Sequence, residues 1–177
     1  MIRRTSLILA AAAAALSLSA CGQSETKAPT LESAGPGDEI VQYEAQDAVM
    51  NAAIAEAKAS LPAFLTRLDA GDIGPGDSLK VGFPVDNGHE HIWVNQIARK
   101  GDELTGVLAN EPNWMPGLHQ GSPVTFAPDL VSDWSYEKDG KLWGNYTTRV
   151  MLPSLPPEDA AAVKANLSDT PTETTTR

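Results

Sequence analysis

Two histidines separated by one residue are the first candidates for chemistry in this sequence. His89 and His91 flank Glu90 in the segment HEHIW. Alternate residues of a β-strand point to the same side, so both imidazoles could reach one metal ion. A complete site needs a third protein ligand, and no spacing rule connects one to this pair. The candidates for that ligand are His119, Glu111 and Asp133.

The plainer interpretation of the pair is structural. In this interpretation, His91 shares one face of a strand with Trp93 and Ile97 as a partly buried, hydrogen-bonded histidine. His89 is then exposed where the strand begins. A metal site requires both histidines to act together, whereas the structural role involves His91 alone. Metal binding by His89 and His91 therefore stays the alternative hypothesis.

Glu90 points to the opposite face of the same strand, beside Ile92 and Val94. A carboxylate among apolar neighbours can serve in proton transfer. More often such a glutamate pairs with a basic residue, and Lys80 or Arg149 would be the partner here. We therefore expect a structural ion pair in preference to a catalytic carboxylate.

Other polar and aromatic residues add candidates for an interaction surface. The run SDW at Ser132–Trp134 lacks the sharp turn of a nucleophile elbow, so its serine and aspartate are expected to hydrogen-bond the backbone. Trp114 is alone in the long loop NEPNWMPGLHQG, and loops of this length inside a domain are often functional. The candidate surface comprises Glu90, His91, Asn110, Trp114, Asp133 and Trp134.

A helix followed by a sheet must position these side chains. Apolar residues at helical spacing predict a helix from about Asp47 to near Ala70, kinked or broken near Pro62. After Gly76, short alternating runs separated by turn residues predict antiparallel strands. Asp139-Gly140 is the strongest hairpin signal among the turns. The predicted strands are DSLKVGF, HIWVNQIAR, ELTGVLA, SPVTFA, SDWSYE and KLWGNYTTRVML.

The predicted fold is therefore a single α+β domain. Its N-terminal helix packs on a bent, mainly antiparallel sheet of about six strands, which is either open or barrel-like. Prolines and acids ahead of an apolar run in PPEDAAAVKANL predict a short C-terminal helix, and the closing SDTPTETTTR is expected to be disordered. No phosphate loop, dinucleotide fingerprint or repeat is present in the sequence, and no cofactor is predicted.

Three of these runs resemble a known family. The segments HEHIWV, GVLANEP and GSPVTFAPDLVSDWSYEKDGKLWGNYTTR are similar, in this order, to the bacterial YegJ-like family, a domain of unknown function. The match extends from about Asp47 to Leu152, includes His91 but not His89, and implies no particular activity. The matching residues are Glu90, His91, Trp93, Gly106, Leu108, Asn110, Pro112, Ser132, Asp133, Trp134, Tyr136, Gly140, Gly144, Tyr146, Thr147 and Arg149.

The N-terminus is typical of an exported lipoprotein. Arg3 and Arg4 precede an apolar run from 7 to 16, which is shorter than the ~20 residues of a membrane-spanning helix. The run LSAC at 18–21 resembles the bacterial lipobox, in which the cysteine receives the lipid. Cys21 is the only cysteine of the chain. We expect cleavage before Cys21 and lipidation of its thiol; the alternative is a secreted protein with one free thiol.

These features predict the domain organisation and the location. Residues 1–20 form the signal peptide, 21–40 a flexible tether, 41–153 one globular domain, and 154–177 the short helix with a disordered tail. In lipoproteins of the kind that this N-terminus resembles, an aspartate directly after the lipidated cysteine is associated with retention in the inner membrane. Here Gly22 follows Cys21, so the expected location is the outer membrane, facing the periplasm.

Charge limits the classes of partner. The formal net charge is −10, and removal of the signal peptide takes away Arg3 and Arg4 but no acid. Nucleic acid and anionic lipid surfaces are therefore poor partners for this chain. The leading hypothesis is a non-enzymatic binding or interaction module, attached to the membrane through Cys21, with a protein or small-molecule partner in the envelope. The alternatives are a metal-dependent enzyme using His89 and His91, and an immunity or envelope-stress protein.

Overall fold

The computed structural model describes residues 38–86 and 88–173, with side chains described from residue 48 onward. The predicted signal peptide, Cys21 and most of the predicted tether lie outside the described residues. The helices are α1 (Asp38–Asp69), α2 (Tyr146–Met151) and α3 (Pro157–Asn166), with 3-10 turns η1 (Pro128–Leu130) and η2 (Leu152–Ser154). No helix in this part of the chain is long and apolar enough to span a bilayer.

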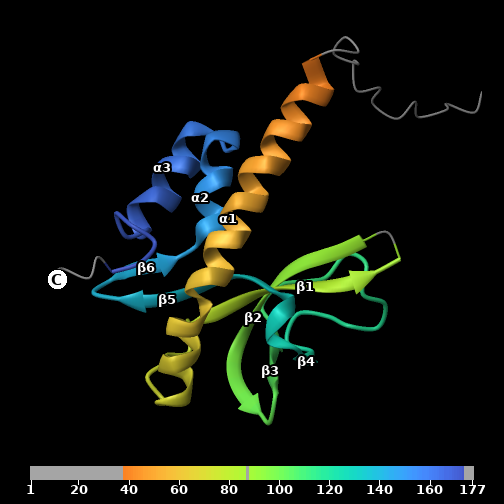
Figure 1. Cartoon of the computed structure of the whole chain (residues 1–177), viewed down its shortest axis with the longest axis vertical. Coiled ribbons are helices and arrows are strands. Elements are labelled where there is room, and N and C mark those ends of the chain that lie inside the picture. Colours follow the sequence, from red (N-terminus) through yellow and green to blue (C-terminus); the bar gives the residue numbers. More distant parts are fainter. Residues whose placement is uncertain (1–37, 87, 174–177) are drawn as a thin grey trace, which may run out of the picture. The chain divides into compact units, whose positions relative to one another are not determined.

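The strands form one antiparallel sheet in the order β4-β3-β2-β1-β5-β6 (Figure 1). The α+β fold and its six strands are therefore confirmed. The sheet is open, with β4 and β6 at its edges, so it does not close into a barrel. The strands are β1 (Ser78–Val85), β2 (Gly88–Lys100), β3 (Glu103–Leu108), β4 (Pro123–Phe126), β5 (Val131–Lys138) and β6 (Lys141–Gly144).

The core lies between one face of the sheet and α1 (Figure 1). Trp134 of β5 is 1% exposed, and its ring centroid lies 6.2 Å from that of Phe64 in α1. Its indole N–H donates to the carbonyl oxygen of Ala57 at 3.2 Å, which satisfies the polar atom that burial of a tryptophan brings with it. Leu79 pairs with Trp134 on one side and with Val94 on the other, so a continuous apolar row crosses three strands.

An irregularity in β2 changes which face its residues occupy. The register with β3 shifts between Asn95 and Ala98, and Gln96 has a φ of 55°. An extra residue at a bulge reverses the alternation beyond it. Ile97 is buried as a result, whereas His91, earlier in the strand, is exposed. The expectation that His91 and Ile97 share a face is therefore wrong.

Helix α1 is longer and more continuous than predicted. It begins at Asp38, ahead of the predicted Asp47, and it passes Pro62 without a break. Pro62 is exposed, whereas Leu61 and Phe64 beside it are buried against the sheet. Burial of this apolar stripe stabilises the helix across the proline, which by itself disfavours a helix interior.

The sixth strand ends much earlier than predicted. The run KLWGNYTTRVML was expected to be one strand, but β6 stops at Gly144 and α2 follows. Gly144 and Asn145 have φ values of 74° and 57°, which turn the chain out of the sheet. A Cβ at Gly144 would lie 2.1 Å from the carbonyl oxygen of Trp134, so only glycine fits at this turn.

The C-terminal segment packs on the domain. Leu167 forms a parallel bridge with Leu142 of β6, and Ser168 is 6% exposed. Arg149 of α2 donates to the Ser168 carbonyl and hydroxyl oxygens, both at 2.9 Å. The sequence predicted a disordered tail from Ser168 onward, whereas the structure places residues 168–173 in defined positions. Residues 174–177 lie outside the described part of the chain.

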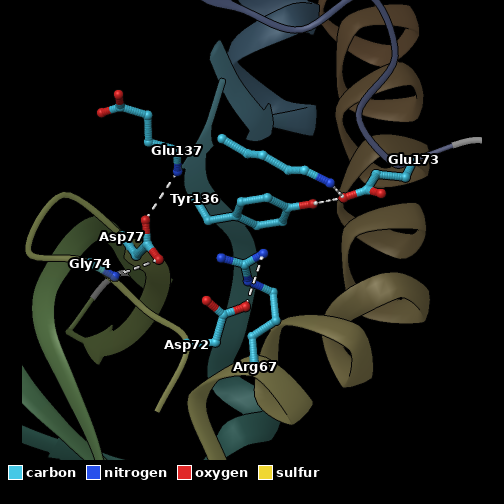
Figure 2. Close-up of polar contacts among 8 residues, drawn as sticks. Arg67, Asp72, Gly74, Asp77, Tyr136, Glu137 and Glu173 are labelled. Atoms are coloured by element: carbon cyan, nitrogen blue, oxygen red, sulfur yellow. Dashed lines mark hydrogen bonds and ion pairs between the residues drawn. The ribbon is translucent and has the colours of Figure 1, made fainter. Parts of the chain in front are cut away.

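A polar cluster ties the end of α1 to the β5–β6 hairpin (Figure 2). The guanidinium carbon of Arg67 lies 4.0 Å from the ring centroid of Tyr136, and its Nη1 is 3.5 Å from the Asp72 carboxylate. Asp77 accepts hydrogen bonds from the backbone N–H of Gly74 at 2.9 Å and of Glu137 at 3.0 Å. These groups fasten the turn between α1 and β1 to β5, which is a structural role.

Candidate functional site

A buried carboxylate holds the long loop between β3 and β4. Glu90 in β2 is 5% exposed. Its Oε1 accepts a hydrogen bond from the backbone N–H of Asn113 at 2.6 Å, and its Oε2 accepts one from the backbone N–H of Trp114 at 2.8 Å. The expected partners Lys80 and Arg149 do not pair with it. Glu90 therefore fixes the backbone of the loop at the residue that carries the loop's tryptophan.

Hydrogen bonds within the loop close its base. The Gly121 N–H donates to the Leu108 carbonyl oxygen at 2.8 Å, and the Gln120 N–H donates to the Glu111 carboxylate at 2.9 Å. The Gln120 side-chain amide also donates to the carbonyl oxygen of Ala109 at 2.8 Å. The loop is thus tied at both ends and pinned in the middle by Glu90, so its shape is defined without a regular element.

The loop presents an exposed tryptophan between two hollows. Trp114 is 67% exposed, which is unusual for the largest apolar side chain. One hollow of about 430 Å³ is lined by Trp114, Val85, His89 and Pro116 among others. A second of about 430 Å³ shares Trp114, Val85 and Pro116 and adds apolar residues of β1 and the loop. His89 therefore belongs to this surface, although the sequence argument left it aside.

His91 lies on the opposite face of β2 from Glu90. Its ring crosses Gly82 of β1, where an added Cβ would lie 3.0 Å from the imidazole Cε1. Across that gap, Nδ1 is 2.8 Å from the hydroxyl oxygen of Ser132 in β5. The Ser132 hydroxyl also lies 3.2 Å from the Lys80 carbonyl oxygen; when it donates its one proton there, Nδ1–H of His91 is the donor to Ser132. The lone pair of the neutral ring is then on Nε2.

The surroundings of His91 are basic. Although His91 is exposed as a whole, its ring is partly covered; this partial burial, and then the charges of Lys80, His89 and Lys58, lower the pKa of His91 from its usual 6.5. Lys80 lies beside Trp93, with its Nζ 5.7 Å from the ring centroid, and donates to the Thr147 hydroxyl at 3.1 Å. Burial lowers the pKa of Lys80 as well, and the Asp133 carboxylate opposes that change.

Asp133 and Trp134 lie in the interior and do not contribute to an exposed surface. Asp133 is fully buried and accepts from the backbone N–H groups of Trp134, Tyr146 and Thr147 at 2.8, 3.1 and 2.8 Å. It also accepts from the Thr147 hydroxyl at 2.6 Å. The expectation that this aspartate hydrogen-bonds the backbone agrees with these contacts, and its role is to hold the first turn of α2 against β5.

The predicted candidates thus separate into three places. Glu90 and Trp114 are in direct contact through the loop backbone, whereas His91 faces away and Asp133 is internal. Asn110 is exposed at the start of the loop. His119 faces Glu111 at 3.9 Å within the loop. Among the described residues, no group of three or more histidine, cysteine, aspartate or glutamate side chains could hold a metal ion.

Sequence reasoning missed Gly82 and assigned Lys80 to Glu90, although both residues shape the surroundings of His91. A signal for Lys80 exists in the alternation of β1, which places it on the face opposite Leu79 and Val81. No local signal marks Gly82, because its importance comes from the cross-strand position opposite His91. Pairing register is a property of the folded sheet.

Comparison with known proteins agrees with the resemblance in the motifs. The chain is 28% identical over 120 residues to the uncharacterized protein YegJ of Escherichia coli strain K12, which covers 67% of this chain and 76% of YegJ. It is 33% identical over 70 residues to the putative ankyrin repeat protein NMB1133/NMB1171 of Neisseria meningitidis serogroup B, over 40% of this chain and 28% of that protein. No solved structure matches significantly. The family described as an uncharacterized protein conserved in bacteria (DUF2314) matches residues 47–169, and this chain belongs to it.

Proposed function

We propose that this chain is a membrane-anchored envelope lipoprotein that binds a protein partner through Trp114 and the two hollows beside it. The observation that carries the proposal is the buried Glu90 carboxylate, which accepts hydrogen bonds from the backbone N–H groups of Asn113 and Trp114. Burying a carboxylate costs free energy, and here the buried carboxylate fixes the backbone that carries an exposed tryptophan. Tryptophans often dominate binding at protein interfaces.

The shape of the surface favours a protein over a small molecule. Small-molecule sites usually enclose most of their ligand, whereas protein interfaces are flatter and centred on a few aromatic residues. Trp114 is 67% exposed and lines both hollows, so its side chain is not enclosed in a single deep cavity. Val85 and Pro116 line both hollows and extend the apolar surface around it.

Site-specific photo-crosslinking in the bacterium that makes the protein tests this surface. A photoreactive phenylalanine analogue replaces Trp114 in one variant and Met151 in the control, since Met151 is another exposed large apolar residue and lies in α2. We expect a discrete protein adduct from position 114 and none of that mass from position 151. The absence of an adduct at 114, or the same adduct from both positions, would argue against the proposal.

Anchoring through Cys21 is the second part of the proposal, and it rests on the lipobox-like LSAC run. Each acyl methylene buried in a bilayer contributes about 0.8 kcal/mol, so several chains hold a protein firmly. We expect the wild-type protein in the membrane fraction, and in the soluble fraction a variant in which a conventionally cleaved export signal replaces residues 1–20 and serine replaces Cys21. Mass spectrometry of the wild-type N-terminal peptide should show acylated Cys21. A free thiol there, or membrane association of the variant, would contradict anchoring by lipid.

A further inference from the structure

The outer face of β1 and β2 is positively charged in a strongly acidic protein. The formal net charge is −10, yet the charged groups that act on the His91 imidazole are Lys80, His89 and Lys58. No carboxylate is among the charged groups described as acting on this ring. Lys80, His89 and Lys58 belong to three elements, β1, β2 and α1, so the positive charge around His91 comes from the folded arrangement and not from a run of basic sequence.

This charge pattern opposes the metal hypothesis and favours the opposite kind of ligand. A divalent cation beside His91 would be repelled by Lys80 and Lys58, and no group of three or more potential ligand side chains is found among the described residues. The two imidazole ring centroids are also 6.4 Å apart and the rings are inclined at 49°. An anion at the same place would be attracted by every charged group that acts on His91.

Two hydrogen-bond donors are available for such an anion. When His91 is protonated, Nδ1–H still donates to Ser132, and Nε2–H has no partner among the described residues. Lys80 Nζ has three protons and uses one for the Thr147 hydroxyl. Lys80 pairs with Trp93, and Gly82 pairs with His91, so Lys80 and His91 are diagonal neighbours roughly 7–8 Å apart on one face.

We propose that a small oxyanion, such as the phosphate, sulfate or carboxylate group of a ligand, binds between Nε2 of His91 and Nζ of Lys80. Gly82 leaves room for the imidazole, because a Cβ there would lie 3.0 Å from Cε1 and would push the ring from its position. Trp93 bounds the site beside Lys80. Neither His91 nor Lys80 lines a Trp114 hollow, so the site does not depend on the proposed protein partner.

Other charged groups near this face do not cancel the site. Asp133 in β5 is opposite Lys80 and its charge acts on that lysine, but the carboxylate is fully buried beneath α2 contacts and is not among the charges that act on His91. In η1, the backbone carbonyl oxygen of Asp129 accepts from Lys58 Nζ at 2.9 Å. On the loop side, Asp86 lines the hollow that contains His89. Because His91 must carry its second proton to donate from Nε2, oxyanion binding should strengthen as the pH falls toward 6.

Histidine NMR with the full described domain tests the site directly. The imidazole resonances of His91 are followed while sodium sulfate, and separately sodium acetate, replaces sodium chloride at constant ionic strength and pH 6. We expect a saturating change at His91, with affinity about five-fold or more weaker at pH 8. The sulfate and acetate arms distinguish a tetrahedral from a carboxylate ligand. His119, an exposed histidine facing Glu111, is the internal control and should not change.

Three variants make the result decisive. Lys80→Met should abolish the saturating change, whereas Lys100→Met, at the exposed end of the same β2 strand that carries His91, should retain it. Lys80 also donates a hydrogen bond to Thr147, so its replacement could disturb the fold as well as the site. Lys58→Met is therefore a second test, because Lys58 is exposed and its loss should weaken anion binding with little effect on folding. An equal change at His119, full binding by Lys80→Met or Lys58→Met, or a stoichiometric response of His91 to zinc without one to sulfate or acetate would overturn the proposal.

Discussion

Replacing Asp133 with asparagine is expected to lower the free energy of unfolding by about 3 kcal/mol or more. The carboxylate is fully buried, and its oxygens accept four hydrogen bonds from Trp134, Tyr146 and Thr147. In the variant, an NH₂ group would replace one of the two carboxylate oxygens. The buried donors that now bond to that oxygen would then have no acceptor. Urea unfolding followed by tryptophan fluorescence measures the change.

Asp102→Asn is the matched control for this substitution. It makes the same chemical change at an exposed position in the turn between β2 and β3, where we expect a change within about 0.5 kcal/mol. A loss below about 1 kcal/mol for Asp133→Asn would show that these hydrogen bonds do not hold α2 against the sheet. In that case, β6 would have to end at Gly144 for backbone reasons alone.

Replacing Glu90 with glutamine is expected to release the loop that carries Trp114. In the wild-type protein, the backbone N–H groups of Asn113 and Trp114 each donate to one oxygen of the Glu90 carboxylate. In the glutamine variant, one of these N–H groups would instead face the side-chain NH₂ group, which cannot accept a hydrogen bond. The loss of a hydrogen bond to a charged acceptor is worth about 1.5–3 kcal/mol, so amide exchange at these two residues should accelerate roughly ten-fold or more. Amide hydrogen exchange followed by NMR resolves both positions.

Glu111→Gln is the control within the same loop. Its carboxylate accepts one hydrogen bond, from the Gln120 N–H at 2.9 Å, and lies at the exposed base of the loop. We expect exchange at Asn113 and Trp114 to be unchanged in this variant. Equal protection of the two amides in wild-type and Glu90→Gln protein would mean that other contacts fix the loop.

Local sequence patterns were sufficient for the sheet but not for its ends. Alternation and turn residues predict the positions of all six strands, and the Asp139-Gly140 turn is present with φ values of 54° and 69°. β6 ends at Gly144, where positive φ values turn the chain, and Asp133 bonds the first turn of the helix that follows. Because tyrosine, threonine and valine favour strands, YTTRV by itself looks like a continuation of β6, and only contacts made in the folded protein favour the helix.

The same reasoning explains which site features were predictable. Trp114 could be identified because it lies in a long loop whose apolar residues follow neither a helical nor a strand pattern. The partner of Glu90 could not be inferred, since it is the backbone of that loop and not a basic side chain. The environment of His91 depends on Gly82 and Ser132 in other strands, so it follows from pairing register and from the bulge between β1 and β5.

The central claim is that Glu90 presents Trp114 to a protein partner, and photo-crosslinking from position 114 in a Glu90→Gln background tests it most directly. Yield is compared with that in the wild-type and Glu111→Gln backgrounds at equal protein levels. We predict that the adduct is strongly reduced in Glu90→Gln and kept in Glu111→Gln, because only Glu90 bonds the backbone of Trp114. An adduct of equal yield in all three backgrounds would contradict the claim.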